Sequence, residues 1–182
     1  MKRFHVPSRG EVSANNQNIF DNLQKNLGFV PNLYATMAYS DTGLENYLHL
    51  QNAKTSLSKK EKEVINLVVS QENACHYCLS AHTVIGKMNG FTDEQILEIR
   101  SGSASFDKKL NALVRFTYEV TALKGSIAKE TTDSFLAAGY TKGSIVDVII
   151  AVADKIVMNY LHNMTQVPID FPLAPELVQR AN

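Results

Sequence analysis

Apolar side chains recur every three or four residues along most of the chain, which is the spacing of one face of an α-helix. Short polar stretches containing glycine, proline, asparagine or serine separate these segments. The sequence lacks the strict alternation of polar and apolar residues that is typical of half-buried strands. The pattern therefore predicts an all-α fold. Helices are expected at 16–27, 33–38, from a cap at Asp41 to Asn52, 58–72, 75–88, from Thr92 to the loop at 101–103, 107–123, 128–138 and 142–164.

Two of these helices begin with a capping box, in which a hydroxyl residue is followed three positions later by Glu or Gln. One runs from Ser58 to Glu61 and the other from Thr92 to Gln95. The last long helix contains a run, 145–153, that is apolar on most sides. Such a run is expected to be buried at the centre of the domain or between subunits.

Length and charge limit the classes of protein to consider. A chain of 182 residues, 45% of them hydrophobic, is expected to form a single domain, 1–182, with a polar N-terminal arm at 1–15 and a proline-rich tail at 166–182. The formal net charge is zero, which argues against a nucleic-acid partner. No apolar stretch resembles a signal peptide or a membrane span, so no membrane partner and a cytoplasmic location are expected.

The segment 63–82 contains both cysteines of the chain and one of its five histidines. A helix that begins at Ser58 is expected to break at 72–74, and the next helix to begin near Cys75. At about 100° per residue, Cys78 lies about 60° from Cys75 around that helix, and His82 about 20° from it. The three side chains are therefore expected to share one face.

This arrangement suits thiolate chemistry. The partial positive charge at a helix start, together with Cys-x-x-Cys spacing, lowers the pKa of a thiol. His82 lies one turn after Cys78, where it can accept the proton, and Glu63 can orient the imidazole. In a helical hairpin, Glu63 would lie about 15 Å before the break and His82 about 10 Å after Cys75, so contact or a water bridge between them is expected.

Other interpretations of the same residues remain open. Cys75 and Cys78, with His82 and Glu63 completing four ligands, form a zinc site in one alternative, although no second Cys or His pair follows. Inert buried thiols are another. The remaining candidates, with packing or capping as the alternative to a place in the pocket, are Tyr77, Ser80 and His162, while His76 is expected to face solvent or an interface.

The pattern formed by Glu63, Cys75, Cys78 and His82, E-x11-C-x-x-C-x-x-x-H, resembles the active-site signature of the alkyl hydroperoxidase D (AhpD-like) group, peroxidase-related branch, in the carboxymuconolactone decarboxylase-like superfamily. The resemblance extends more weakly from residue 27 to residue 170. One difference is that alkyl hydroperoxidase D has a histidine directly before the second cysteine, where this chain has Tyr77. The retained cysteines distinguish the chain from the decarboxylase branch.

The resemblance implies an AhpD-like helical bundle with the Cys-x-x-Cys motif at the N-terminus of a central helix, and a thiol peroxidase with no metal or cofactor. By that similarity, Cys78 is the peroxidatic cysteine, Cys75 resolves it, and His82 with Glu63 forms the proton relay. The expected partners are a hydroperoxide substrate, an external dithiol reductant of the lipoamide or thioredoxin type, and further copies of the chain in a trimer or hexamer. The alternatives are a disulfide-reductase adaptor or redox sensor that serves a separate peroxidase, and a non-redox, metal-binding member of the superfamily.

Overall fold

The computed structural model of the protein describes residues 4–177, and within that range it contains helices and no strand. This confirms the all-α prediction. A short 3-10 turn, η1, spans Arg9–Glu11. The α-helices are Ala14–Leu27 (α1), Asn32–Met37 (α2), Gly43–Gln51 (α3), Lys59–Glu72 (α4), His76–Met88 (α5), Asp93–Arg100 (α6), Lys108–Ala122 (α7), Lys129–Ala137 (α8) and Lys142–Thr165 (α9).

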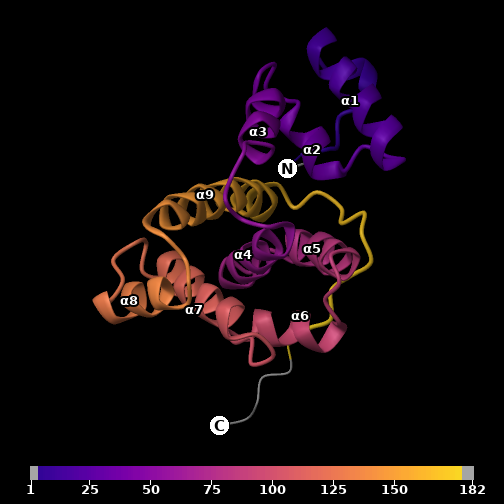
Figure 1. The fold of residues 1–182 in the computed structure, drawn as a ribbon. Helices are drawn as coiled ribbons and strands as arrows, with labels where there is room; N and C mark the ends of the chain where they lie inside the picture. Colours follow the sequence, from indigo (N-terminus) through magenta and orange to yellow (C-terminus); the bar gives the residue numbers. More distant parts are fainter. Residues whose placement is uncertain (1–3, 178–182) are drawn as a thin grey trace.

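Helix α4 is the centre of the arrangement. It packs against α5, α6, α7 and α9, and Figure 1 shows it enclosed between α9 on one side and α6 and α7 on the other. Helices α1, α2 and α3 form a separate layer across α9, and both α2 and α3 contact α9 (Figure 1). Glu63 on α4 and the start of α5 are thus held in the interior by neighbours that are far apart in the sequence.

The main hydrophobic core lies between α4 and the helices that follow α5. Leu67 of α4 and Leu113 of α7 are fully buried in it. Phe135 of α8 is also fully buried and stacks between Phe116 and Tyr140, with ring centroids 4.2 Å apart on each side. These contacts fix α7, α8 and the start of α9 around α4, so the central helix has little freedom to move.

Both predicted capping boxes are present. The Ser58 hydroxyl accepts from the Glu61 N–H while the Glu61 carboxylate accepts from the Ser58 N–H, and Thr92 and Gln95 make the reciprocal pair at α6. The predicted cap at Asp41 is wrong: Thr42 is the N-cap of α3, and the Ser40 hydroxyl accepts from the Gly43 N–H at 3.0 Å. Ser40 therefore satisfies the first amide that Asp41 was expected to bind.

The apolar run of α9 is buried on one side only. Val148 and Val152 are buried in the core, whereas Val146, Ile149 and Ile150 are 59%, 43% and 43% exposed. Burial at the domain centre is thus correct for one face of the helix. Burial of the other face between subunits stays a prediction.

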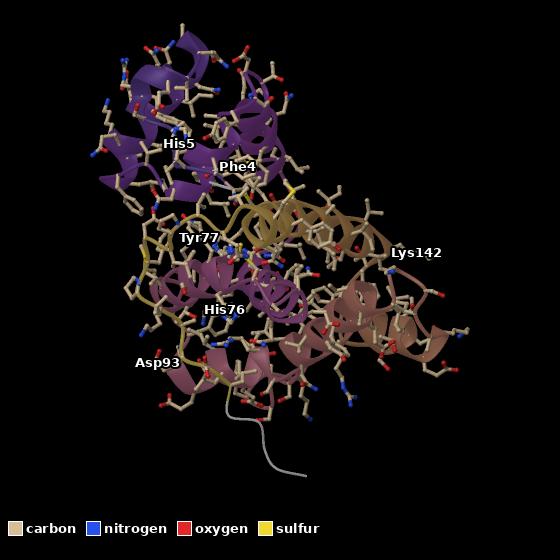
Figure 2. All side chains as sticks on the ribbon, turned by 180° about the vertical axis from the view of Figure 1, so that it is seen from behind. Phe4, His5, His76, Tyr77, Asp93 and Lys142 are labelled. Carbon is tan, nitrogen blue, oxygen red and sulfur yellow. The ribbon has the colours of Figure 1, made fainter. Side chains whose placement is uncertain are left out.

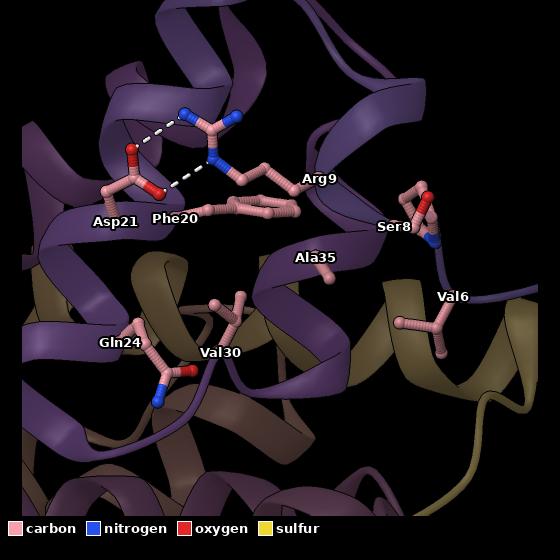
Figure 3. A pocket seen from close by; sticks show the side chains of 9 residues that line it. Val6, Ser8, Arg9, Phe20, Asp21, Gln24, Val30 and Ala35 are labelled. Carbon is pink, nitrogen blue, oxygen red and sulfur yellow. Dashed lines mark hydrogen bonds and ion pairs between the residues drawn. The ribbon is translucent and has the colours of Figure 1, made fainter.

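The two ends of the described chain are tied to the helices. Near the N-terminus, Arg9 pairs with Asp21 of α1 at 2.7 Å, beside a cavity of about 270 Å³ that Phe20 lines (Figure 3). After α9, the chain crosses back over α5, where the Ala174 N–H donates to the Ser80 hydroxyl at 3.1 Å. Residues 1–3 of the expected arm and 178–182 of the expected tail lie outside the described residues. No helix within 4–177 is both long and apolar enough to cross a membrane.

Removing the cap of the central helix tests how strongly it stabilises the fold. In Ser58→Ala, the N–H of Glu61 loses its acceptor, and we expect the free energy of unfolding to fall by about 1 kcal/mol. Urea unfolding followed by circular dichroism measures this. Ser134→Ala is the control, because Ser134 is exposed and its hydroxyl bonds only a carbonyl of its own helix, and it should change stability by less than about 0.5 kcal/mol. Equal effects of the two substitutions would contradict the role given to the cap.

Candidate active site

The break between α4 and α5 places Cys75 at the start of a helix. Ala74 has a left-handed backbone, with φ of 49°, which reverses the chain and lets the Cys75 N–H donate to the Ser70 carbonyl at 2.9 Å. Cys75 is the N-cap residue of α5, and its Sγ lies 3.5 Å from the Cys78 backbone nitrogen, which donates to it. Both cysteines are free thiols, 0% and 3% exposed. The structure therefore brings the two sulfur-bearing residues together in the first turn of α5.

Glu63 and His82 are in direct contact. The His82 Nδ1 lies 2.8 Å from the Glu63 Oε2, and both side chains are buried. The other carboxylate oxygen, Oε1, accepts from the Asn66 side chain at 3.0 Å. Since a carboxylate only accepts hydrogen bonds, Nδ1 carries a proton and Nε2 is the nitrogen left to exchange one.

Two opposing effects act on the Glu63 carboxylate. Burial alone raises the pKa of Glu63, but the charge of His82, its hydrogen bond and the charge of Lys155 together hold the pKa below its usual value. Glu63 is therefore an anion at neutral pH.

The two thiols have different acidities. The pKa of Cys78 is lowered to about 6, chiefly by the hydrogen bond from Cys75 and also by the charges of Lys155 and His82, which together outweigh the effect of burial. The pKa of Cys75 is raised, chiefly because its S–H donates to Cys78, and also by burial. At neutral pH, Cys78 is the thiolate and Cys75 is the thiol. The lower pKa makes Cys78 the more readily ionised thiol of the two, and the catalytic roles of the cysteines stay a prediction.

Helix α9 contributes residues that the sequence did not single out as part of the site. The Asn159 side chain donates to the Ser70 hydroxyl at 3.2 Å and accepts from Asn73 at 3.1 Å, so it holds the C-terminal end of α4 just before the helix break. Lys155, one turn earlier on α9, is only 2% exposed. The signal that was available is that polar residues, Asp154, Lys155 and Asn159, interrupt an otherwise apolar helix.

Two tyrosines of α2 and α3 complete the surroundings. The Tyr34 hydroxyl donates to the Gln51 side chain at 2.7 Å, and Gln51 donates to the Tyr47 hydroxyl at 3.0 Å. Burial raises the pKa of Tyr34 to about 12 and raises the pKa of Tyr47 as well, so both stay neutral. Tyr47 packs in the same hydrophobic cluster as Cys75 and Cys78, and Tyr34 packs against that cluster.

A cavity of about 300 Å³ opens beside the Glu63–His82 pair. Its wall also includes Tyr34, Ile85 and Ile150, but neither cysteine lines it. A small molecule in the cavity would thus meet the carboxylate and imidazole first.

The other sequence candidates have packing and capping contacts. His76 is exposed, as expected, whereas Tyr77 is buried, and the two side chains leave α5 in different directions (Figure 2). The Tyr77 hydroxyl accepts from the Leu33 N–H at 3.2 Å, and its ring lies 5.2 Å from that of His162. Ser80 donates to the His76 carbonyl and accepts from the C-terminal segment. Within 4–177, no group of three or more His, Cys, Asp and Glu residues is arranged to hold a metal ion.

The different acidities of the thiols can be measured directly. In the reduced protein, we expect iodoacetamide to label Cys78 with a midpoint near pH 6, because the thiolate is the nucleophile, and to leave Cys75 unlabelled up to about pH 9. Peptide mass spectrometry assigns the label, with Cys78→Ser as the control. If Cys75 were labelled first in the unsubstituted protein, the two roles would be reversed.

Comparison with known proteins adds a partial family match and a shared fold. Residues 41–119 match the model of the carboxymuconolactone decarboxylase family. Comparison with curated proteins gives no significant match.

Several solved structures share the fold over most of the chain. An uncharacterized peroxidase-related protein from Ralstonia eutropha JMP134, described as an alkylhydroperoxidase AhpD core, has a TM-score of 0.83 at 20% identity and covers 92% of each chain. A second peroxidase-related protein, from Silicibacter sp. TM1040, has a TM-score of 0.79 at 22% identity and covers 97% of this chain and 93% of its own. The debrominase Bmp8, in complex with 2,3,4-tribromopyrrole, has a TM-score of 0.74 at 16% identity, with coverage of 91% and 90%.

These structures show that the chain has the AhpD-like fold. The segment matched by the family model contains the whole pattern from Glu63 to His82. The chain is thus similar to the carboxymuconolactone decarboxylase family over residues 41–119 and shares the AhpD-like fold over most of its length.

Proposed function

We propose that the protein reduces hydroperoxides through a redox-active Cys75–Cys78 pair, with Glu63 and His82 as the proton relay. The observation that carries this proposal is the buried 2.8 Å contact between His82 and Glu63, one helical turn beyond a cysteine whose pKa is lowered to about 6. A thiolate one helical turn from an imidazole that a carboxylate orients combines a nucleophile with a group that can transfer a proton. The names of the two peroxidase-related structures support the same reaction class.

In the first step, the Cys78 thiolate attacks the terminal oxygen of the hydroperoxide. An S–O bond forms, the O–O bond breaks, and the alkoxide leaves with a proton from His82. The products are a sulfenic acid on Cys78 and an alcohol. Glu63 keeps Nδ1 of His82 protonated throughout, so only Nε2 exchanges the proton.

In the second step, the Cys75 sulfur attacks the Cys78 sulfenic acid. The S–S bond forms as hydroxide leaves, and the Cys75 proton and the hydroxide make water, with His82 moving the proton directly or through a water. An external dithiol then reduces the disulfide by exchange through a mixed disulfide. The complete reaction converts one hydroperoxide and one dithiol into an alcohol, a water and an oxidised dithiol.

A disulfide-reductase adaptor or redox sensor is the second candidate function. The observation in its favour is that both thiols are almost completely buried, at 0% and 3% exposure, which slows direct reaction with a peroxide. An adaptor would exchange disulfides with its partner faster than it consumes peroxide. The debrominase has a similar fold but is named for a different activity, so dehalogenation is a further activity to test.

We also propose that the working form is a homo-oligomer. A stripe on α9, with Ala153 at its middle, leaves the side chains of Val146, Ile150, Val157, Tyr160 and Met164 between 43% and 65% exposed. A continuous apolar stripe of this length on a helix is typical of a contact between subunits. This face supports the prediction of further copies as partners.

The main test is the mass of the reduced, metal-free protein before and after a few equivalents of cumene hydroperoxide. We expect rapid loss of two hydrogen atoms, mapped by peptide analysis to a Cys75–Cys78 disulfide, and a stable sulfenic acid on Cys78 in Cys75→Ser. Cys78→Ser should be unreactive. Unchanged thiols in the unsubstituted protein would refute the peroxidase. A parallel incubation with 2,3,4-tribromopyrrole, in which bromide release is measured, tests the activity named for the debrominase.

Glu63→Gln tests the relay. The substitution keeps the size of the side chain but removes the carboxylate that orients His82, so the rate of peroxide reduction should fall roughly 10- to 100-fold. Stopped-flow measurement of thiol oxidation reports this rate. Glu72→Gln, exposed at the end of the same helix, is the control, and a rate unchanged in Glu63→Gln would exclude the relay.

A further inference from the structure

Lys155 is a buried cation in the middle of α9. Its side chain is 2% exposed, and a buried ammonium is costly unless an opposite charge offsets the loss of water. Among the residues that the structure describes, no carboxylate forms an ion pair with it. No permanent ion pair therefore offsets the free-energy cost of burying the Lys155 charge among the described residues.

The helical register directs Lys155 toward the two cysteines. Met158, three residues later, packs in the cluster that contains Cys75 and Cys78, and Asn159, four residues later, bonds Ser70 at the helix break. Residues three and four apart share a helix face, and side chains lean toward the N-terminus of the helix. Helix α9 contacts both α4 and α5. The charge of Lys155 accordingly acts on Cys78 and on Glu63, and lowers the pKa of each.

The charges around Cys78 leave one role for this cation. Glu63 is already paired with His82, and Cys75 is held as a thiol. The phenols near Cys78 are those of Tyr34, Tyr47 and Tyr77, and all three stay neutral because burial raises their pKa values. Asp154 precedes Lys155 on α9 and acts on Tyr34 and Tyr47, about 100° around the helix. Of the groups near Cys78, the one whose negative charge is gained on reduction and lost on disulfide formation is the Cys78 thiolate.

We propose that Lys155 is the counter-ion of the Cys78 thiolate and that its charge favours the reduced dithiol over the Cys75–Cys78 disulfide. The proposal rests on the proposed function, because it assigns a regulator of the same dithiol. Lys155 touches neither substrate nor transferred proton in this role. It is a positioning residue that acts through Cys78.

The effect on reduction follows from the balanced exchange. The disulfide and an external dithiol give the Cys75 thiol, the Cys78 thiolate, the oxidised external pair and one proton. A negative charge next to Lys155 exists only on the product side, so a fixed positive charge there shifts the equilibrium toward the reduced protein. The same principle makes disulfides strongly oxidising when the reduced form is stabilised. Lys155 thereby makes the Cys75–Cys78 disulfide easier for an external dithiol to reduce.

The experiment compares Lys155→Met with two other variants. Met matches the length of the apolar part of Lys, and replacement of a buried charge by Met is often neutral for stability. Lys155→Arg keeps the charge. Lys142→Met removes an exposed lysine at the start of the same helix, far from α5 (Figure 2), and serves as the matched control.

Two quantities are measured, and neither needs a peroxide. The first is the pH midpoint of Cys78 alkylation by iodoacetamide, and the second is the fraction of disulfide in dithiothreitol redox buffers at pH 7. In Lys155→Met, the midpoint should rise and the alkylation rate at pH 6 should fall about tenfold. The equilibrium should move about tenfold toward the disulfide, which is about 30 mV for a two-electron couple. Lys155→Arg should restore both values, and Lys142→Met should match the unsubstituted protein.

A Lys155→Met protein that folds, with both quantities unchanged, would overturn the proposal. If Lys155→Met does not fold, the proposal is tested by the NMR resonances of the Lys155 side chain in the unsubstituted protein. These resonances are assigned by comparison with Lys155→Arg. They should shift with a midpoint near pH 6 when Cys78 ionises and stay constant in Cys78→Ser. Resonances that do not follow Cys78 would refute the counter-ion.

Failure of the proposed function gives a different result. A protein that shows both Lys155 effects but does not react with hydroperoxides would refute the peroxidase and keep the counter-ion. A protein that forms no Cys75–Cys78 disulfide in any redox buffer would refute both the dithiol function and the redox half of the proposal. The alkylation midpoint would then decide the electrostatic half alone.

Discussion

The contact between Glu63 and His82 is the interaction on which the site depends. It joins α4 to α5 in the interior, where a single charged side chain without a partner would be strongly destabilising. Because α4 also packs against α6, α7 and α9, the position of Glu63 is fixed by most of the fold. The imidazole of His82 is therefore held in one orientation by a carboxylate that cannot move independently of the core.

The helix break at Ala74 gives the two cysteines different environments. Cys75 is outside the first turn of α5 and uses its sulfur to accept the Cys78 N–H, whereas Cys78 lies within the turn. The positive end of the helix and the S–H of Cys75 both favour charge on Cys78. Two identical side chains three residues apart thus acquire opposite pKa shifts, chiefly from local geometry.

Local signals predicted the helices well, and long-range packing explains what they missed. The capping boxes at Ser58 and Thr92 are local, so they could be recognised in the sequence, whereas the Asp41 cap failed because Ser40 competes for the same amide. Helical geometry placed Glu63 and His82 at roughly comparable depths of about 15 and 10 Å, which predicted contact or a water bridge without choosing between the two. The places of Lys155 and Asn159 depend on how α9 crosses the helix break, which no local pattern encodes.

Burial of the sulfur atoms separates the place where a small molecule can bind from the place where it must react. The cavity of about 300 Å³ reaches Glu63 and His82, yet neither cysteine lines it. Tyr34 stands both in the wall of this cavity and against the cysteine cluster, and Gln51 links its hydroxyl to that of Tyr47. The N-terminal layer therefore contacts both the cavity and the cysteine cluster, while α5 and α9 determine the charge of the thiolate.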